Sequence, residues 1–74
     1  MTHIDTQESP NHWEFTFELT EAQTESLSEA RLSDYFLEFD LTFEELTVCV
    51  YKDEPDESPN SARDCVERMI ARCM

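Results

Sequence analysis

The chain contains no glycine and only one lysine among its 74 residues. Without glycine, turns must be made by Asn, Asp, Ser, Pro or residues in right-handed turn conformations. The same absence excludes the glycine-rich loops that let a backbone approach a phosphate group. No apolar run approaches about 18 residues, so we expect no transmembrane helix. The N-terminus, MTHIDTQESP, lacks the basic and apolar regions of a secretory signal, which predicts a cytoplasmic protein.

Cysteine and histidine are few and irregularly spaced. Three cysteines, Cys49, Cys65 and Cys73, are an odd number and do not resemble a disulfide framework, so we expect reduced, buried thiols. The two histidines, His3 and His12, lie in or beside a polar N-terminal segment. No zinc-binding spacing and no Cys/His or Ser/His/Asp arrangement follows from these positions. The sequence therefore predicts no metal site, no cofactor and no enzymatic activity.

Charge is distributed very unevenly along the chain. Eighteen Asp and Glu oppose five Lys and Arg, which gives a net charge of −13. Residues 1–60 contain sixteen of these acids but only Arg31 and Lys52 as cations, whereas Arg63, Arg68 and Arg72 lie in residues 61–74. A field of this sign attracts cationic surfaces and repels nucleic acid and anionic membranes. We therefore expect a basic protein partner and no direct binding of nucleic acid or membrane.

The apolar pattern is nevertheless that of a folded domain. Apolar residues make up 39% of the chain and eight residues are aromatic, which is too many for a disordered acidic tail. Seventy-four residues form one domain with a modest core, for which homodimerisation is an ordinary remedy. Residues 1–11 show no periodicity and are predicted to be a flexible arm, so the domain is expected to span residues 12–74.

Three segments alternate with the period of a half-buried strand. In residues 12–20, Trp13, Phe15, Phe17 and Leu19 alternate with polar residues. In residues 35–43, the predicted core face carries Tyr35, Leu37, Phe39, Leu41 and Phe43. Residues 46–51 complete the set with Leu46, Val48 and Val50. Between the last two strands, the connection 43–46 fits either a tight hairpin turn or one helical turn, and the sequence does not decide between them.

Two segments have the pattern of helices. Residues 21–31 contain good helix formers, and Thr20 with Gln23 is a plausible capping box. A second helix is predicted to begin at Pro59, with Ser58 as its cap and an apolar stripe at positions 62, 65, 66, 69, 70 and 73. The expected fold is α+β with the order β-α-β-β-α. A three-stranded, mostly antiparallel sheet would carry both helices on one face.

Rows of carboxylates follow from this arrangement. Glu14 and Glu18 are predicted to project away from the core on the first strand, and Glu38 and Asp40 on the second, with Glu44 just beyond. Glu21, Glu25 and Glu29 form a further row at i, i+4 and i+8 on one helix face. Alternate residues on a strand repeat at about 6.6 Å. Carboxylates at such spacings can occupy lysine and arginine sites that otherwise hold phosphates.

Two aromatic residues are predicted to lie off the core face, namely Phe36 and Tyr51. Exposed aromatics among polar residues are typical of the centre of a protein interface. They would belong to a partner-binding surface or to the contact between two copies of the chain.

In size, charge and carboxylate rows, the chain resembles the small acidic phage-encoded inhibitors that mimic DNA, including anti-CRISPR and anti-restriction proteins. The resemblance implies a non-enzymatic inhibitor that binds the basic groove of a nucleic-acid-binding protein in the host cytoplasm. An alternative is a structural homodimer whose apolar surface includes Phe36, Tyr51 and the C-terminal helix. In that case, the acidic surface would serve solubility or adaptation to high salt.

Overall fold

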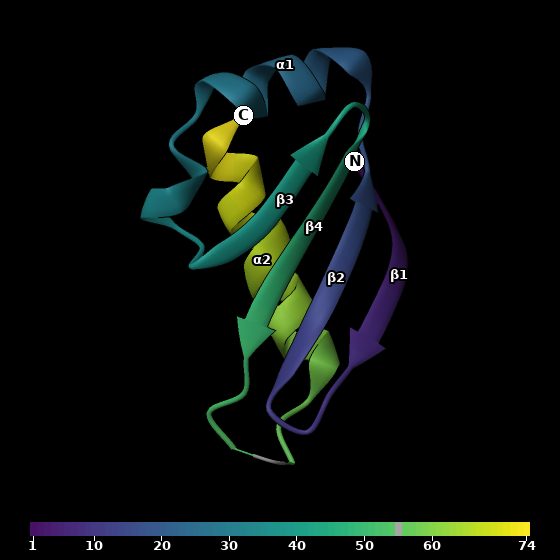
Figure 1. The fold of residues 1–74 in the computed structure, drawn as a ribbon, viewed down its shortest axis with the longest axis vertical. Helices are drawn as coiled ribbons and strands as arrows, with labels where there is room; N and C mark the ends of the chain where they lie inside the picture. Colours follow the sequence, from purple (N-terminus) through teal and green to yellow (C-terminus); the bar gives the residue numbers. More distant parts are fainter. Residues whose placement is uncertain (55) are drawn as a thin grey trace.

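The computed structural model describes residues 1–54 and 56–74 and shows a small α+β domain with two helices and an antiparallel sheet (Figure 1). The elements are β1 (Thr2–Glu8), β2 (His12–Glu18), α1 (Glu21–Glu29), a 3-10 turn (Leu32–Asp34), β3 (Glu38–Thr42), β4 (Glu45–Tyr51) and α2 (Pro59–Cys73). The described part of the chain forms a four-stranded sheet in the order β1-β2-β4-β3. The class is as predicted, but the sheet has one strand more than expected.

The additional strand is β1, which corrects the prediction of a flexible arm at residues 1–11. β1 pairs antiparallel with β2, with Thr6 opposite Phe15 and a register shift between His3 and Asp5. The His3 ring meets the rings of Phe15 and Phe17 edge-on, at centroid distances of 6.3 and 5.6 Å. The strand was missed because its contacts with the core come from a histidine, whereas its aliphatic residue, Ile4, is 49% exposed.

One long helix, α2, lies against one face of the sheet, and the opposite face is left uncovered (Figure 1). Pro59 begins α2 after Ser58, as predicted, although the Ser58 side chain makes no capping hydrogen bond. The core is formed by apolar residues of β2, β4 and α2 together with α1 and the 3-10 turn. Its fully buried members include Trp13, Phe15, Phe17, Leu27, Leu46, Val48 and Ile70.

The shorter helix, α1, crosses one end of the sheet, beside the C-terminal end of α2 (Figure 1). Its start confirms the predicted capping box: the Gln23 amide donates to Thr20 Oγ1 (3.1 Å), and the Thr20 amide donates to Gln23 Oε1 (2.9 Å). Leu27 anchors the helix in the core. Its remaining residues are exposed or half-buried, so α1 closes an end of the core and leaves the sheet surface free.

The segment between α1 and β3 departs from the predicted strand at 35–43. The Phe36 amide donates to the Leu32 carbonyl (2.9 Å), and this helical bond places Leu32 and Phe36 together in the core. Leu37, predicted to be buried, is instead 90% exposed. β3 therefore begins only at Glu38. The residues just before it follow a helical turn, so the predicted strand does not extend to them.

The connection between β3 and β4 is a two-residue turn, Phe43-Glu44. Glu44 has a φ of 63°, in the left-handed region that usually favours glycine. Its amide donates to Thr24 Oγ1 (3.1 Å), and its carbonyl accepts from the Leu19 amide (2.8 Å). These two bonds hold the residue in a conformation that costs an L-amino acid about 1 kcal/mol or more.

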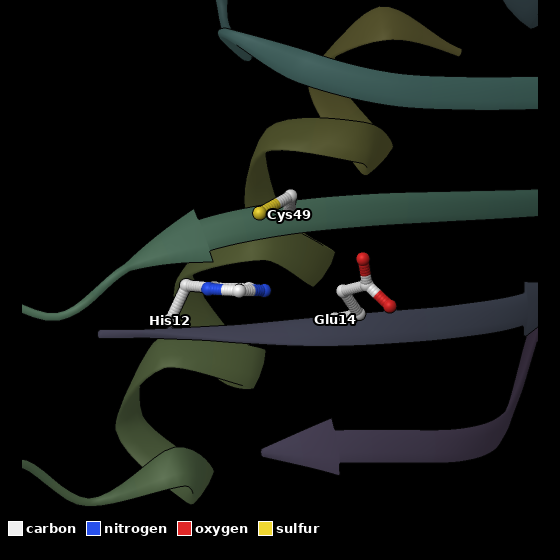
Figure 2. Close-up of side chains that lie close together, drawn as sticks. All are labelled: His12, Glu14 and Cys49. Carbon is white, nitrogen blue, oxygen red and sulfur yellow. The ribbon is translucent and has the colours of Figure 1, made fainter. Parts of the chain in front are cut away.

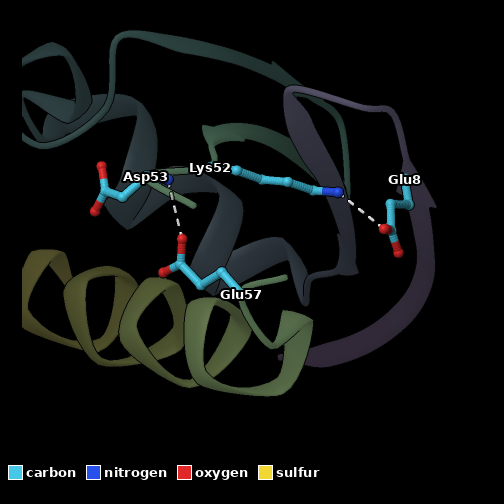
Figure 3. Close-up of polar contacts among 4 residues, drawn as sticks. All are labelled: Glu8, Lys52, Asp53 and Glu57. Carbon is cyan, nitrogen blue, oxygen red and sulfur yellow. Dashed lines mark hydrogen bonds and ion pairs between the residues drawn. The ribbon is translucent and has the colours of Figure 1, made fainter. Parts of the chain in front are cut away.

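The single lysine of the sequence, Lys52, directly follows β4, and its side chain extends toward Glu8 of β1 (Figure 3). Lys52 Nζ lies 2.8 Å from Glu8 Oε2 and 5.0 Å from the centroid of the Trp13 ring. The Lys52 side chain is only 4% exposed, so its ammonium group depends on these partners. Beyond it, the predicted polar loop 52–60 includes the Asp53 amide donating to Glu57 Oε2 (3.0 Å), whereas Pro55 lies outside the described residues.

We expect Glu44→Gly to raise the free energy of unfolding by about 1 kcal/mol, because glycine adopts φ of 63° without steric cost and retains both backbone hydrogen bonds. Glu44→Gln removes the same charge but keeps the conformational cost, so it is the matched control. Urea unfolding of both variants measures the difference. Equal stability of the two variants would show that Glu44 is not strained.

The Glu8–Lys52 pair predicts a pH-dependent contribution to stability. A hydrogen bond from Lys52, and then the lysine's charge, lowers the pKa of Glu8 below its ordinary value. Because the folded pKa is lower than the unfolded one, the contribution is fully present above the unfolded pKa and disappears as pH falls through the folded pKa.

Glu8→Gln should therefore lower Tm at pH 7, and its Tm should converge with that of the wild type at acidic pH. Asp5→Asn is the matched control, since it removes a carboxylate from the same strand on the opposite side of the sheet. Thermal unfolding followed by circular dichroism over a pH series gives the comparison. A difference between Glu8→Gln and wild type that persists in acid would contradict this assignment.

Candidate acidic binding face

The uncovered face of the sheet carries carboxylates from all four strands. The strand register places Asp5 opposite Thr16, Glu18 opposite Glu45, and both Glu14 and Glu38 opposite Cys49. The apolar residues that alternate with these positions point toward α2. We call this surface the acidic face and define it by the following carboxylates: Asp5, Glu14, Glu18, Glu38, Asp40 and Glu45.

No lysine or arginine compensates these charges within the sheet. The sequences of β1, β2, β3 and β4 contain neither residue type. In the part of the chain described, Lys52 pairs with Glu8 on the helix side, and Arg63 and Arg68 pair with Glu67 and Asp64 on α2 (3.8 and 2.8 Å). Directly opposed like charges such as Glu18 and Glu45 disfavour the sheet slightly. The strands therefore carry only negative side-chain charges on the acidic face, and the apolar core stabilises the sheet against their repulsion.

The centre of the acidic face is a shallow hollow of about 170 Å³ between β2, β4 and β3. Its lining residues are Glu14, Glu38, Phe39, Asp40, Thr47 and Cys49. Burial, followed by a hydrogen bond with Glu38 and the charges of Glu38 and Glu14, raises the pKa of the Cys49 thiol. The Tyr51 hydroxyl donates to Glu38 Oε1 (3.0 Å), and this bond raises the pKa of Tyr51. Glu38 thus contributes to the raised pKa of both groups, although burial is the larger cause for Cys49.

At one side of this hollow, His12, Glu14 and Cys49 come together (Figure 2). One ligand-type atom from each side chain lies within 4.8 Å of the other two, and all three residues are half-buried. Sequence spacing did not reveal this cluster, because Cys49 lies on a strand far along the chain. The signal that could have found it is the cross-strand register, which pairs Glu14 with Cys49.

The predicted partner-binding residues occupy three different environments. Glu14, Glu18, Glu38 and Asp40 share the acidic face, as predicted, and Tyr51 joins them through its bond to Glu38. The remaining carboxylates lie at the end of the sheet, on α1 or in the β3–β4 turn: Glu21, Glu25, Glu29 and Glu44.

Phe36, in contrast, was predicted to be exposed and is 6% exposed in the core. The helical bond from its amide to Leu32 shifts the phase of the alternation, which turns this ring inward. A functional role for Phe36 as an exposed contact is therefore ruled out.

An apolar groove of about 400 Å³ lies between β4, residues 35–37 and α2. Phe36 and Tyr51 line the groove together with Ala62, Val66 and Met69 of α2. Beside the groove, β3 is an edge strand of the sheet, and Leu37 projects into solvent just before it. Asp53 and Glu57 add negative charge at the rim.

No protein-family model matches the sequence, and neither a curated protein nor a solved structure is significantly similar to it. Over residues 1–54 and 56–74, neither helix has the length and apolar character needed to cross a membrane.

Proposed function

We propose that this protein is a non-enzymatic inhibitor whose acidic face binds the cationic nucleic-acid-binding surface of a target protein. Suitable targets are a CRISPR effector, a restriction enzyme or another nuclease with a basic groove. The observation that carries the proposal is the segregation of charge: six carboxylates share the uncovered sheet face, and the four strands contain no lysine or arginine.

The geometry of a sheet makes the carboxylates a regular array. Glu38 and Asp40 are alternate residues of β3 and repeat at about 6.6 Å, whereas Glu14 lies two strands away from Glu38, at about 10 Å. A basic groove that binds DNA neutralises phosphates with several lysines and arginines. An array of fixed carboxylates can engage the same cations, and long-range attraction accelerates the encounter.

The shape of the acidic face supports binding rather than catalysis. Its hollow is shallow, at about 170 Å³, and Glu38 and Asp40 on its rim are exposed. General acid–base catalysis usually depends on an enclosed pocket that shifts the pKa values of its carboxyl groups. A flat, open surface instead suits contact with a large partner.

A capture experiment with competing DNA tests the proposal. The tagged protein is incubated with lysate that contains candidate nucleic-acid enzymes, and the retained proteins are identified after washes at low and high salt. The expected result is a nucleic-acid-binding protein that is retained at low salt and displaced by added DNA. Retention that DNA does not affect would contradict mimicry.

Charge-neutral variants then locate the binding surface. Glu38→Gln with Asp40→Asn should weaken inhibition of DNA binding by the captured protein about tenfold, because two carboxylates of the acidic face are lost. Asp64→Asn with Glu67→Gln removes the same charge from α2 and should leave inhibition unchanged. Fluorescence anisotropy of labelled DNA gives both values. Equal effects of the two double variants would mean that net charge, not the acidic face, governs binding.

A second candidate function is a structural homodimer, which the apolar groove favours. Leu37 is 90% exposed next to the edge strand β3, and Tyr51 and α2 line the groove behind it. Burying these residues against a second copy would remove apolar surface from water. Since each copy carries a charge of −13, salt that screens the repulsion would promote this association.

If the groove is a dimer contact, Leu37→Ser should shift the mass in solution from dimer to monomer. Leu37 is the residue to test because Phe36→Ser would damage the core instead. Sedimentation at low and molar salt provides the measurement, and Ser33→Ala, an exposed change in the preceding turn, is the control. A monomer at every salt concentration would remove this second candidate.

A further inference from the structure

Three side chains with different metal-binding atoms meet on the acidic face. His12 and Glu14 rise from β2, and Cys49 rises from the neighbouring strand β4 (Figure 2). An imidazole nitrogen, a carboxylate oxygen and a thiol sulfur all lie within 4.8 Å of one another. None of the three is used by the core, and each is half-buried at the surface of the sheet.

The geometry points to a zinc-binding site formed by His12, Glu14 and Cys49, with water as the fourth ligand. Nitrogen, sulfur and oxygen atoms of these residue types are the ligands of protein-bound Zn²⁺. The thiolate and imidazole distinguish the site from calcium and magnesium sites, which consist of oxygen ligands. This inference goes beyond the proposed inhibitor function and does not depend on it.

The backbone holds these ligands close to the geometry that zinc requires. His12 and Glu14 are alternate residues and therefore lie on the same side of β2, whereas Cys49 is directly opposite Glu14 in the register. Bonds of about 2.0–2.3 Å in a tetrahedron place ligand atoms roughly 3.5 Å apart. The three atoms lie within 4.8 Å of one another, so the side chains must rotate closer together to bind the metal, while the two central strands β2 and β4 fix their backbone positions.

Two neighbouring residues would support the ligands. Glu38 lies opposite Cys49 on β3 and accepts the Tyr51 hydroxyl bond of 3.0 Å. The Tyr51 ring lies against the His12 imidazole, with centroids 5.7 Å apart. Such surrounding contacts orient metal ligands and contribute to affinity. The negative charge of the acidic face attracts a divalent cation, and Cys49 releases its proton to solvent when it becomes a thiolate ligand.

Titration of the full, reduced chain with metal alone tests the site. Calorimetry with Zn²⁺ should give one tight site per chain, and Co²⁺ should produce the absorption of a cobalt–thiolate bond. Cys49→Ser should abolish that absorption and weaken zinc binding at least about 100-fold, because loss of a direct ligand costs at least as much as loss of a supporting contact. Glu14→Gln should weaken binding while leaving the thiolate absorption detectable at higher metal concentrations.

Matched variants separate this site from nonspecific binding to an acidic protein. Cys65→Ser removes an exposed thiol on α2, and Asp34→Asn removes an exposed carboxylate in the 3-10 turn, outside the acidic face. Both should retain wild-type affinity, and circular dichroism shows whether each variant is folded.

Several outcomes would overturn the inference. These are an unchanged affinity in folded Cys49→Ser and Glu14→Gln, a cobalt–thiolate signal that depends on Cys65, or displacement of Zn²⁺ by a modest excess of Mg²⁺. If Cys49→Ser does not fold, Glu14→Gln and His12→Gln provide the test, since both must weaken Zn²⁺ binding relative to Asp34→Asn. Each experiment uses only the metal. A lack of zinc binding would therefore not bear on whether the acidic face binds a basic partner.

Discussion

The structure depends on one constraint: a single 15-residue helix covers one face of a four-stranded sheet. The aromatic residues of β2 must therefore all point to that side, where Trp13, Phe15 and Phe17 are fully buried. The opposite positions of each strand are left to solvent, and in this sequence they are rich in carboxylates. One-sided burial thus leaves the other face to polar residues, and this sequence places carboxylates there, so the core must offset the mutual repulsion of the acids.

The acidic face combines two kinds of local environment. Toward Glu18 and Glu45, the carboxylates are exposed and face one another across strands, which suits contact with mobile lysine and arginine side chains. Toward Cys49, the side chains are half-buried and chemically mixed, which suits a compact cation. A zinc ion there would offset negative charge in one corner and leave the rest of the face anionic, so the two proposed roles are compatible on one surface.

The sequence predicted the elements whose pattern is local and regular. β2, the capped start of α1 and most of the stripe of α2 were recognised, and so were the outward positions of Glu14, Glu18, Glu38 and Asp40. The prediction of buried thiols was wrong: Cys65 is exposed, and Cys49 and Cys73 are only half-buried. β1 was missed because its core contact is made by His3 rather than by alternating apolar residues.

Other features depend on contacts that no local pattern encodes. Phe36 was misplaced because one backbone bond to Leu32 changed the period from two to that of a helical turn. The His12–Glu14–Cys49 cluster needs the pairing of two strands that are separated by α1, β3 and their connections, and therefore emerges only from the register.

The β3–β4 turn has a consequence for folding. Glu44 is held at positive φ by bonds to Leu19, which follows β2, and to Thr24 in the first turn of α1. An isolated β3–β4 hairpin lacks both partners, so closure of the turn is coupled to docking of these two residues.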